Sequence, residues 1–106
     1  MDERRRSPRV RVDLPARWEG VLNQEQAQVT DLSITGCFVL TGGRVEGKEL
    51  VRLEIDLPDQ DPLYFWAEVV DAAYEIGFAV RFTAMEEEDE KRLSDFINAE
   101  LRKTTR

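Results

Sequence analysis

The 106-residue chain contains no histidine and only one cysteine. Histidine is the commonest general base and the commonest transition-metal ligand, so its absence argues against most catalytic and metal sites. One cysteine cannot form an internal disulfide or a cysteine-rich zinc site. The sequence also offers no nucleophile–base pair and no glycine-rich phosphate loop. We therefore expect a protein that is not an enzyme, that has no catalytic residue and that holds no metal.

Long apolar stretches are also missing. No run of about 18 apolar residues is present, so we expect no membrane insertion. The charged start at residues 1–4 is not followed by the apolar segment of a signal peptide, which favours a cytoplasmic location. The length suits a single domain over residues 1–106, and an apolar content of 42% is typical of a folded chain.

The net charge of −7 is unevenly distributed. Residues 1–17 hold six arginines against three acidic residues, whereas residues 18–106 hold nine basic and 19 acidic ones. This split indicates a basic arm that serves an anionic partner on an acidic body. Because the body would repel a long phosphate backbone, we expect a small anion and no long nucleic acid. A solvated terminus whose arginines have no function is an equally weighted alternative from the charge alone.

Alternating apolar residues predict strands along most of the chain. Val51, Leu53 and Ile55 alternate with charged residues and give the clearest example. Pro15 would interrupt a central strand, so the first strand is expected to lie at an edge or to bend there. The other predicted strand segments are 10–14, 16–21, 27–32, 34–40, 64–70 and 76–82. Five or six short strands in so small a chain most simply form an antiparallel barrel or a strongly coiled sheet.

The apolar period changes near residue 83. Thr83 and Glu86 have the spacing of a capping box, and the acidic run 86–90 complements a helix dipole. The following apolar residues recur on one helical face: Leu93, Phe96, Ile97 and Leu101. We predict a C-terminal helix over residues 84–103 that packs on the sheet. The acidic run is interpreted mainly as a solvated helix start, with a surface for partner docking as the lesser alternative.

A cluster of arginines, Arg4-Arg5-Arg6-Ser7-Pro8-Arg9, is the first candidate binding motif. The planar guanidinium group pairs with phosphate oxygens or guanine edges and stacks on bases. Pro8 restricts the preceding residue to extended conformations, so the motif is not expected to be helical.

The segment Asp31-Leu32-Ser33-Ile34-Thr35-Gly36 is the second candidate motif. If it is extended, Asp31 and Ser33 face outward while Leu32 and Ile34 face the core. Gly36 would then permit a bend or the close approach of a ligand. The alternative is a turn in which Asp and Ser bond to the local backbone, and these residues alone favour that interpretation.

The two tryptophans and the single cysteine are the other residues with distinctive chemistry. Trp18 and Trp66 are predicted to pack inside the barrel and not to form a stacking platform for bases. Cys37 follows Gly36 within an apolar run, which predicts a buried structural thiol.

Together the two motifs resemble the signature of the PilZ domain family, which is Arg-x-x-x-Arg followed some twenty or more residues later by Asp/Asn-x-Ser-x-x-Gly. Residues 5–9 match the first part, with Arg4 as a further preceding arginine, and residues 31–36 match the second. Residues 76–82 look like the last strand of the family, and the segment through Phe96 looks like its C-terminal helix. The resemblance therefore covers nearly the whole chain.

The resemblance implies an all-β fold with one C-terminal α-helix, a six-stranded antiparallel β-barrel of PilZ type. Residues 1–9 would form a mobile basic arm, residues 10–83 the barrel and residues 84–103 the helix. The family binds the bacterial second messenger cyclic di-GMP, which would be a ligand and not a cofactor. The implied ligand-binding residues are Arg4, Arg5, Arg9, Asp31, Ser33 and Gly36.

The resemblance also assigns a role to these residues. Arg5 and Arg9 would contact the phosphates and the guanine Hoogsteen edges, and Asp31 would accept hydrogen bonds from guanine N1–H and N2–H₂. Ser33 would add a hydroxyl contact and Gly36 would leave room for the guanine ring. The arm would become ordered over the ligand and the module would then signal to an unidentified protein partner, as a monomer or a homodimer.

Two other functions compete with this one. A PilZ-like adaptor that binds proteins and has no affinity for the nucleotide is the main alternative. Binding of single-stranded nucleic acid on a small barrel is a third possibility, but the acidic body argues against it.

Overall fold

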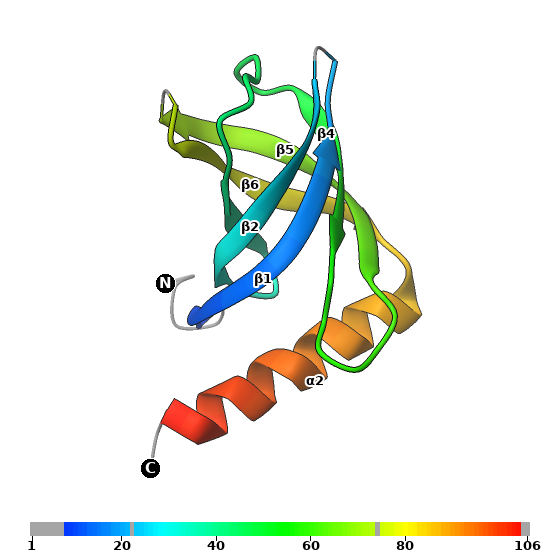
Figure 1. Ribbon diagram of the computed structural model, residues 1–106. Coiled ribbons are helices and arrows are strands. Elements are labelled where there is room, and N and C mark those ends of the chain that lie inside the picture. The colour runs from blue at the N-terminus through cyan, green and yellow to red at the C-terminus, as the bar shows by residue number, and fades with distance from the viewer. Residues whose placement is uncertain (1–7, 22, 74, 105–106) are drawn as a thin grey trace, which may run out of the picture.

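The computed structural model describes residues 8–21, 23–73 and 75–104 (Figure 1). The strands close into an antiparallel barrel with the order β1-β2-β3-β6-β5-β4, and a helix follows the last strand. The predicted six-stranded antiparallel β-barrel with a C-terminal helix is therefore confirmed. The elements are β1 (Val10–Glu19), β2 (Gln24–Leu32), β3 (Gly36–Leu40), β4 (Leu50–Ile55), β5 (Leu63–Ala73), β6 (Gly77–Met85) and α2 (Glu87–Thr104).

Alternation of apolar and polar residues builds the barrel wall. Val51, Leu53 and Ile55 of β4 point inward and are buried, while the residues between them are at least partly exposed. Trp18 of β1 lies in the core and meets Phe78 edge to face, with 5.0 Å between the ring centroids. Its indole N–H donates to Thr41 Oγ1 at 3.2 Å, so the buried ring has a polar partner. The prediction that Trp18 packs in the barrel is confirmed.

Trp66 contradicts the same prediction. It lies on β5 between Phe65 and Ala67, which are buried in the core, so the alternation turns its side chain outward. Trp66 is 45% exposed. A large aromatic residue is thus placed on the outer wall because the strand register, and not its hydrophobicity, determines its direction.

Pro15 lies where β1 changes from one paired neighbour to two. The β1–β2 register shifts between Arg11 and Leu14, and pairing of β1 with β4 begins only at Ala16. Pro15 therefore lies before the doubly paired part of the strand, and its carbonyl accepts the Asp56 N–H at 2.9 Å. Because β1 pairs with both β2 and β4 in a closed barrel, the expectation that it lies at an edge is wrong.

Helix α2 runs beneath one end of the barrel (Figure 1), with Leu93 and Ile97 buried and Phe96 and Leu101 partly buried against the core. This confirms the predicted apolar stripe. No helix of the described residues combines the length and the apolar character needed to cross a membrane.

The predicted start of this helix is wrong. Pairing of β6 with β5 continues to Met85, which lies opposite Phe65, so Thr83 belongs to a strand and does not cap the helix. The first helical hydrogen bond runs from the Glu90 N–H to the Glu86 carbonyl at 2.9 Å, and α2 begins at Glu87.

Candidate functional site

The two candidate motifs meet at one end of the barrel. Arg4 and Arg5 lie outside the described residues, but Arg9 directly precedes β1 and Asp31 lies near the end of β2. The antiparallel register places Val10 opposite Leu32, which brings the start of one strand beside the end of the other.

A direct contact joins the two motifs. Arg9 Nη1 lies 3.4 Å from Asp31 Oδ2, although the residues are 22 positions apart in the sequence. The Arg9 side chain is 56% exposed and that of Asp31 is 42% exposed. Solvent screens an ion pair of this kind strongly, so it contributes little to stability and is easily exchanged for a stronger anionic partner.

Ser33 is buried inside a tight turn, so the expectation that it faces outward is wrong. Its exposure is 1%, and its Oγ accepts the backbone N–H groups of Thr35 at 3.1 Å and of Gly36 at 3.2 Å. Ile34, expected in the core, is 43% exposed. The cause is that β2 ends at Leu32, and the reversal of the chain cancels the alternation beyond it. The alternative interpretation of a locally bonded turn is correct for Ser33.

Gly36 lies where the turn meets strand β6. A Cβ atom at this position would lie 2.2 Å from the Val80 carbonyl oxygen, far inside any normal contact. The Phe82 N–H also donates to the Thr35 carbonyl at 2.9 Å. The missing side chain of Gly36 therefore permits close approach of β6, and the turn that follows Asp31 is held rigidly against the barrel.

Cys37 follows this turn and points into the core, as predicted. Burial raises the pKa of the Cys37 thiol well above its ordinary value, and the positive charge of Arg9 acts in the opposite direction. The thiol is therefore protonated and unreactive at neutral pH.

Sequence analysis missed two arginines near the candidate site. Arg11 lies opposite Asp31 in the β1–β2 pair, and Arg81 lies opposite Gly36 in the β3–β6 pair. The guanidinium of Arg81 forms an ion pair with Glu68 of β5. Only the strand pairing reveals these neighbours, since neither arginine belongs to a short motif with fixed spacing.

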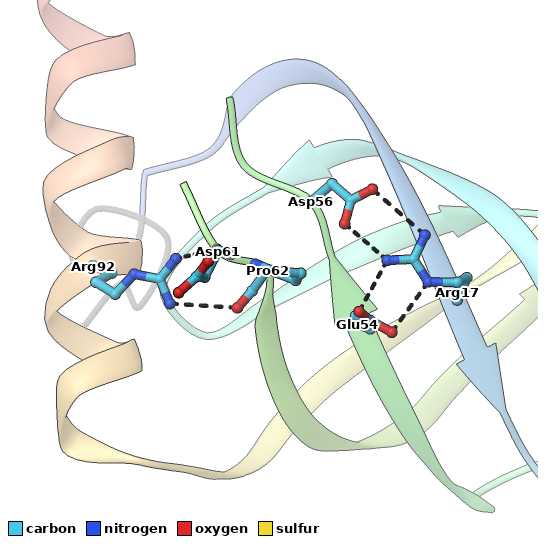
Figure 2. A network of polar contacts seen from close by, with 6 residues as sticks. All are labelled: Arg17, Glu54, Asp56, Asp61, Pro62 and Arg92. Carbon is cyan, nitrogen blue, oxygen red and sulfur yellow. Dashed lines mark hydrogen bonds and ion pairs between the residues drawn. The ribbon is translucent and has the colours of Figure 1, made fainter. Parts of the chain in front are cut away.

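A further polar network contains none of these residues (Figure 2). Arg17 of β1 bridges Glu54 at 3.0 Å and Asp56 at 2.8 Å. Hydrogen bonding to Arg17 lowers the pKa of Glu54, and hydrogen bonding to Glu54 raises the pKa of Tyr64. This network ties β1 to β4 and the segment after it, and contains no predicted site residue. Within the part of the chain that the structure describes, no group of three His, Cys, Asp or Glu residues is placed to hold a metal ion.

The fold and the motifs define a small closed barrel with a basic segment beside an Asp-x-Ser-x-x-Gly turn. The family model described as PilZ domain matches residues 3–99. The chain therefore belongs to the PilZ domain family. No curated protein sequence matches it.

Solved structures with the same fold are distant in sequence. The inhibitor of motility MotI/DgrA from Bacillus subtilis superposes with a TM-score of 0.80 at 18% identity, covering 96% of this chain and 54% of that protein. The PilZ domain of YcgR from Escherichia coli, solved with c-di-GMP, gives 0.76 at 16% identity and covers 96% and 95%. The MrkH–c-di-GMP complex of K. pneumonia gives 0.79 at 15% identity and covers 99% and 56%. The present chain thus spans about half the length of MotI/DgrA and MrkH.

Proposed function

We propose that this chain binds cyclic di-GMP between its basic N-terminal segment and the β2–β3 turn. The observation that carries the proposal is the contact between Arg9 and Asp31, because it unites the two family motifs at one end of the barrel. Membership of the PilZ family and the c-di-GMP complexes of YcgR and MrkH support it.

The chemistry of the residues suits a small dianion with two guanines. Arg4, Arg5 and Arg9 supply guanidinium groups for phosphates and Hoogsteen edges. To contact the ligand, Arg9 would break its ion pair with Asp31. Asp31 would then be available to accept hydrogen bonds from guanine N1–H and N2–H₂. Ser33 and Gly36 hold the turn that presents Asp31, and any direct contact of the Ser33 hydroxyl with the ligand would require this turn to rearrange.

We also propose that ligand binding orders residues 1–9 over the nucleotide and that the ordered arm creates a surface for a protein partner. An arginine-rich segment that closes on a ligand is a familiar switching device, since ligand contacts offset the loss of chain entropy.

The first prediction concerns the two signature arginines. Arg5→Ala and Arg9→Ala should each weaken cyclic di-GMP binding at least tenfold, because a charge-assisted hydrogen bond contributes about 1.5–3 kcal/mol. Isothermal titration calorimetry measures affinity and stoichiometry together. Arg52→Ala is the matched control, since this exposed arginine lies on the outer wall at β4 and should leave affinity unchanged. Unchanged affinity in both signature variants would contradict the assignment.

A protein-binding adaptor without nucleotide affinity is the second candidate. The specific observation in its favour is that Ser33 is buried and bonded within its own turn. Absence of any heat of binding with the unmodified chain at millimolar ligand would favour the adaptor.

A further inference from the structure

The outer wall of the barrel carries an open groove that the proposed nucleotide site does not use. Its volume is about 760 Å³, and it lies along β1, β4 and β5, with the end of β6 and the start of α2 at one side. None of Arg9, Asp31, Ser33 and Gly36 is among the residues that line it. The groove is therefore a separate surface.

Cross-strand pairing aligns the side chains of the groove in two rows. One row runs across Glu19, Arg52 and Trp66, and the adjacent row runs across Arg17, Glu54 and Tyr64. Since residues directly opposite in antiparallel strands share a face, both rows project outward. Tyr64 and Trp66 are each about half exposed. Exposed aromatic residues on one face of a strand are typical of binding surfaces.

The position of Arg52 shows that the aromatic wall, formed by Tyr64 and Trp66, accepts a guanidinium group. Its guanidinium carbon lies 5.9 Å from the centre of the Trp66 ring, within the range of a cation–π contact. Its other partner is Glu19, at 3.7 Å, and both side chains of that pair are more than half exposed. Such a pair is weak, so an incoming guanidinium can compete for either group.

Carboxylates outnumber cations around the groove. Its lining holds two arginines, Arg17 and Arg52, against five acidic residues: Glu19, Glu54, Glu86, Glu87 and Asp89. Arg17 forms ion pairs with Glu54 and Asp56 (Figure 2), and Asp89 forms one with Arg92 at 3.0 Å. Glu86 and Glu87 are exposed and form no ion pair with another described residue. The surplus negative charge beside the aromatic wall complements a cationic partner.

From this combination we infer that the groove docks an arginine-bearing segment of a protein partner. Arginine fits better than lysine because its planar group stacks on Trp66 while its N–H groups still reach a carboxylate. This partner surface needs no nucleotide, so it goes beyond cyclic di-GMP binding and is tested in its absence.

The test is a titration of the full, ¹⁵N-labelled chain with a ten-residue peptide of alternating arginine and glycine. Binding is monitored by NMR. The two indole N–H signals act as internal reporters: that of exposed Trp66 should shift strongly, while that of Trp18, which lines the groove but is buried in the core, should shift much less. Glycine peptides with lysine or glutamate in place of arginine are compared, and the expected order of affinity is arginine, then lysine, with no binding of the glutamate peptide.

Matched variants locate the interaction. Trp66→Ala should weaken binding of the arginine peptide about threefold or more, whereas Val70→Ala, an exposed residue of the same strand outside the groove, should not. Glu86→Gln with Glu87→Gln should weaken binding similarly. Glu88→Gln with Glu90→Gln removes the same charge from the same helix start but lies outside the groove, and should have a smaller effect.

Three results would overturn the inference. The first is an unshifted Trp66 signal at millimolar arginine peptide. The second is equal weakening by the groove variants and their controls, which would indicate unspecific attraction to an acidic protein. The third is a Trp66 signal that changes with protein concentration alone, because a second copy of the chain would then occupy the groove.

Discussion

Gly36 is the residue at which the candidate site depends most directly on packing. Its backbone lies so close to β6 that a methyl group would meet the Val80 carbonyl at 2.2 Å. Because backbone and not a flexible side chain is in the way, Gly36→Ala must displace the turn or the strand. We predict a loss of about 1–3 kcal/mol in the free energy of unfolding, which urea denaturation would measure.

Gly42→Ala is the matched control for this prediction. A Cβ atom at Gly42 would have no heavy atom within 4 Å. The substitution should change stability by less than about 1 kcal/mol, and in the stabilising direction if the unfolded chain loses freedom. Equal effects of the two substitutions would show that glycine entropy, and not the approach of β6, determines the cost at Gly36.

Sequence patterns predicted which residues lie together at the candidate site better than they predicted where those side chains point. The spacing of the two motifs identified Asp31 and Arg9, which indeed lie together. The same alternation failed at Ser33 and Ile34, because it assumes that the strand continues past the residue where it ends. At Trp66 it failed for a related reason: one step in register places a hydrophobic ring on the outer wall.

Among the elements, α2 depends on a small number of attachments to the barrel. Leu93 and Ile97 are buried, and the Arg92 side chain donates to the backbone carbonyls of Asp61 and Pro62 in the β4–β5 connection (Figure 2). The same guanidinium pairs with Asp89 of the helix at 3.0 Å. Arg92 thus joins one turn of α2 to a loop about thirty residues earlier in the chain.

Replacement of this arginine should loosen the helix without unfolding the barrel. Arg92→Lys keeps the charge but lacks the planar fork that reaches two carbonyls and Asp89 together. We predict that amide hydrogen exchange in α2 accelerates about tenfold, while exchange in β2 and β3 is little changed. Lys91→Arg is the control, because Lys91 is highly exposed and its ion pair among the described residues is with Asp95 of the same helix. Equal acceleration in the strands would mean that helix and barrel open as one unit.

The order of strands in the barrel could not be read from local patterns. Periodicity identified strand segments such as that around Leu53, but closure requires β3 to pair with β6 and β1 to pair with β4. In each pair two other strands lie between the partners in the sequence, and period-two alternation is the same whichever neighbour a strand takes. The number of strands favoured a barrel or a strongly coiled sheet, and the resemblance to a family implied a barrel of six strands. The two motifs that carry this resemblance are brought together by the pairing of β1 with β2.

For the whole molecule, the join between β1 and β4 is the step that closes the barrel. Four residue pairs, from Ala16 opposite Ile55 to Glu19 opposite Arg52, form this seam. On its outer face Arg17 binds Glu54 and Asp56. Because hydrogen bonding to Arg17 holds the pKa of Glu54 below its ordinary value of 4.5, the folded state favours the ionised carboxylate.

The sign of the resulting pH dependence follows from linkage. A carboxyl group whose pKa is lowered by folding stabilises the protein above its unfolded pKa, and this stabilisation is lost as the pH falls through the folded value. Arg17→Met should therefore lower the free energy of unfolding at pH 7 by about 1 kcal/mol, a modest amount because the side chains of Arg17, Glu54 and Asp56 remain partly exposed to solvent. The difference from the unmodified chain should shrink as the pH falls below 4.5. Urea denaturation at pH 7, 5, 4 and 3 would measure this difference.

Arg52→Met, which removes the longer pair with Glu19 on the same seam, should have a smaller effect at pH 7. A difference for Arg17→Met that stays constant down to pH 3 would show that the packing of its side chain, and not its charge, stabilises the seam.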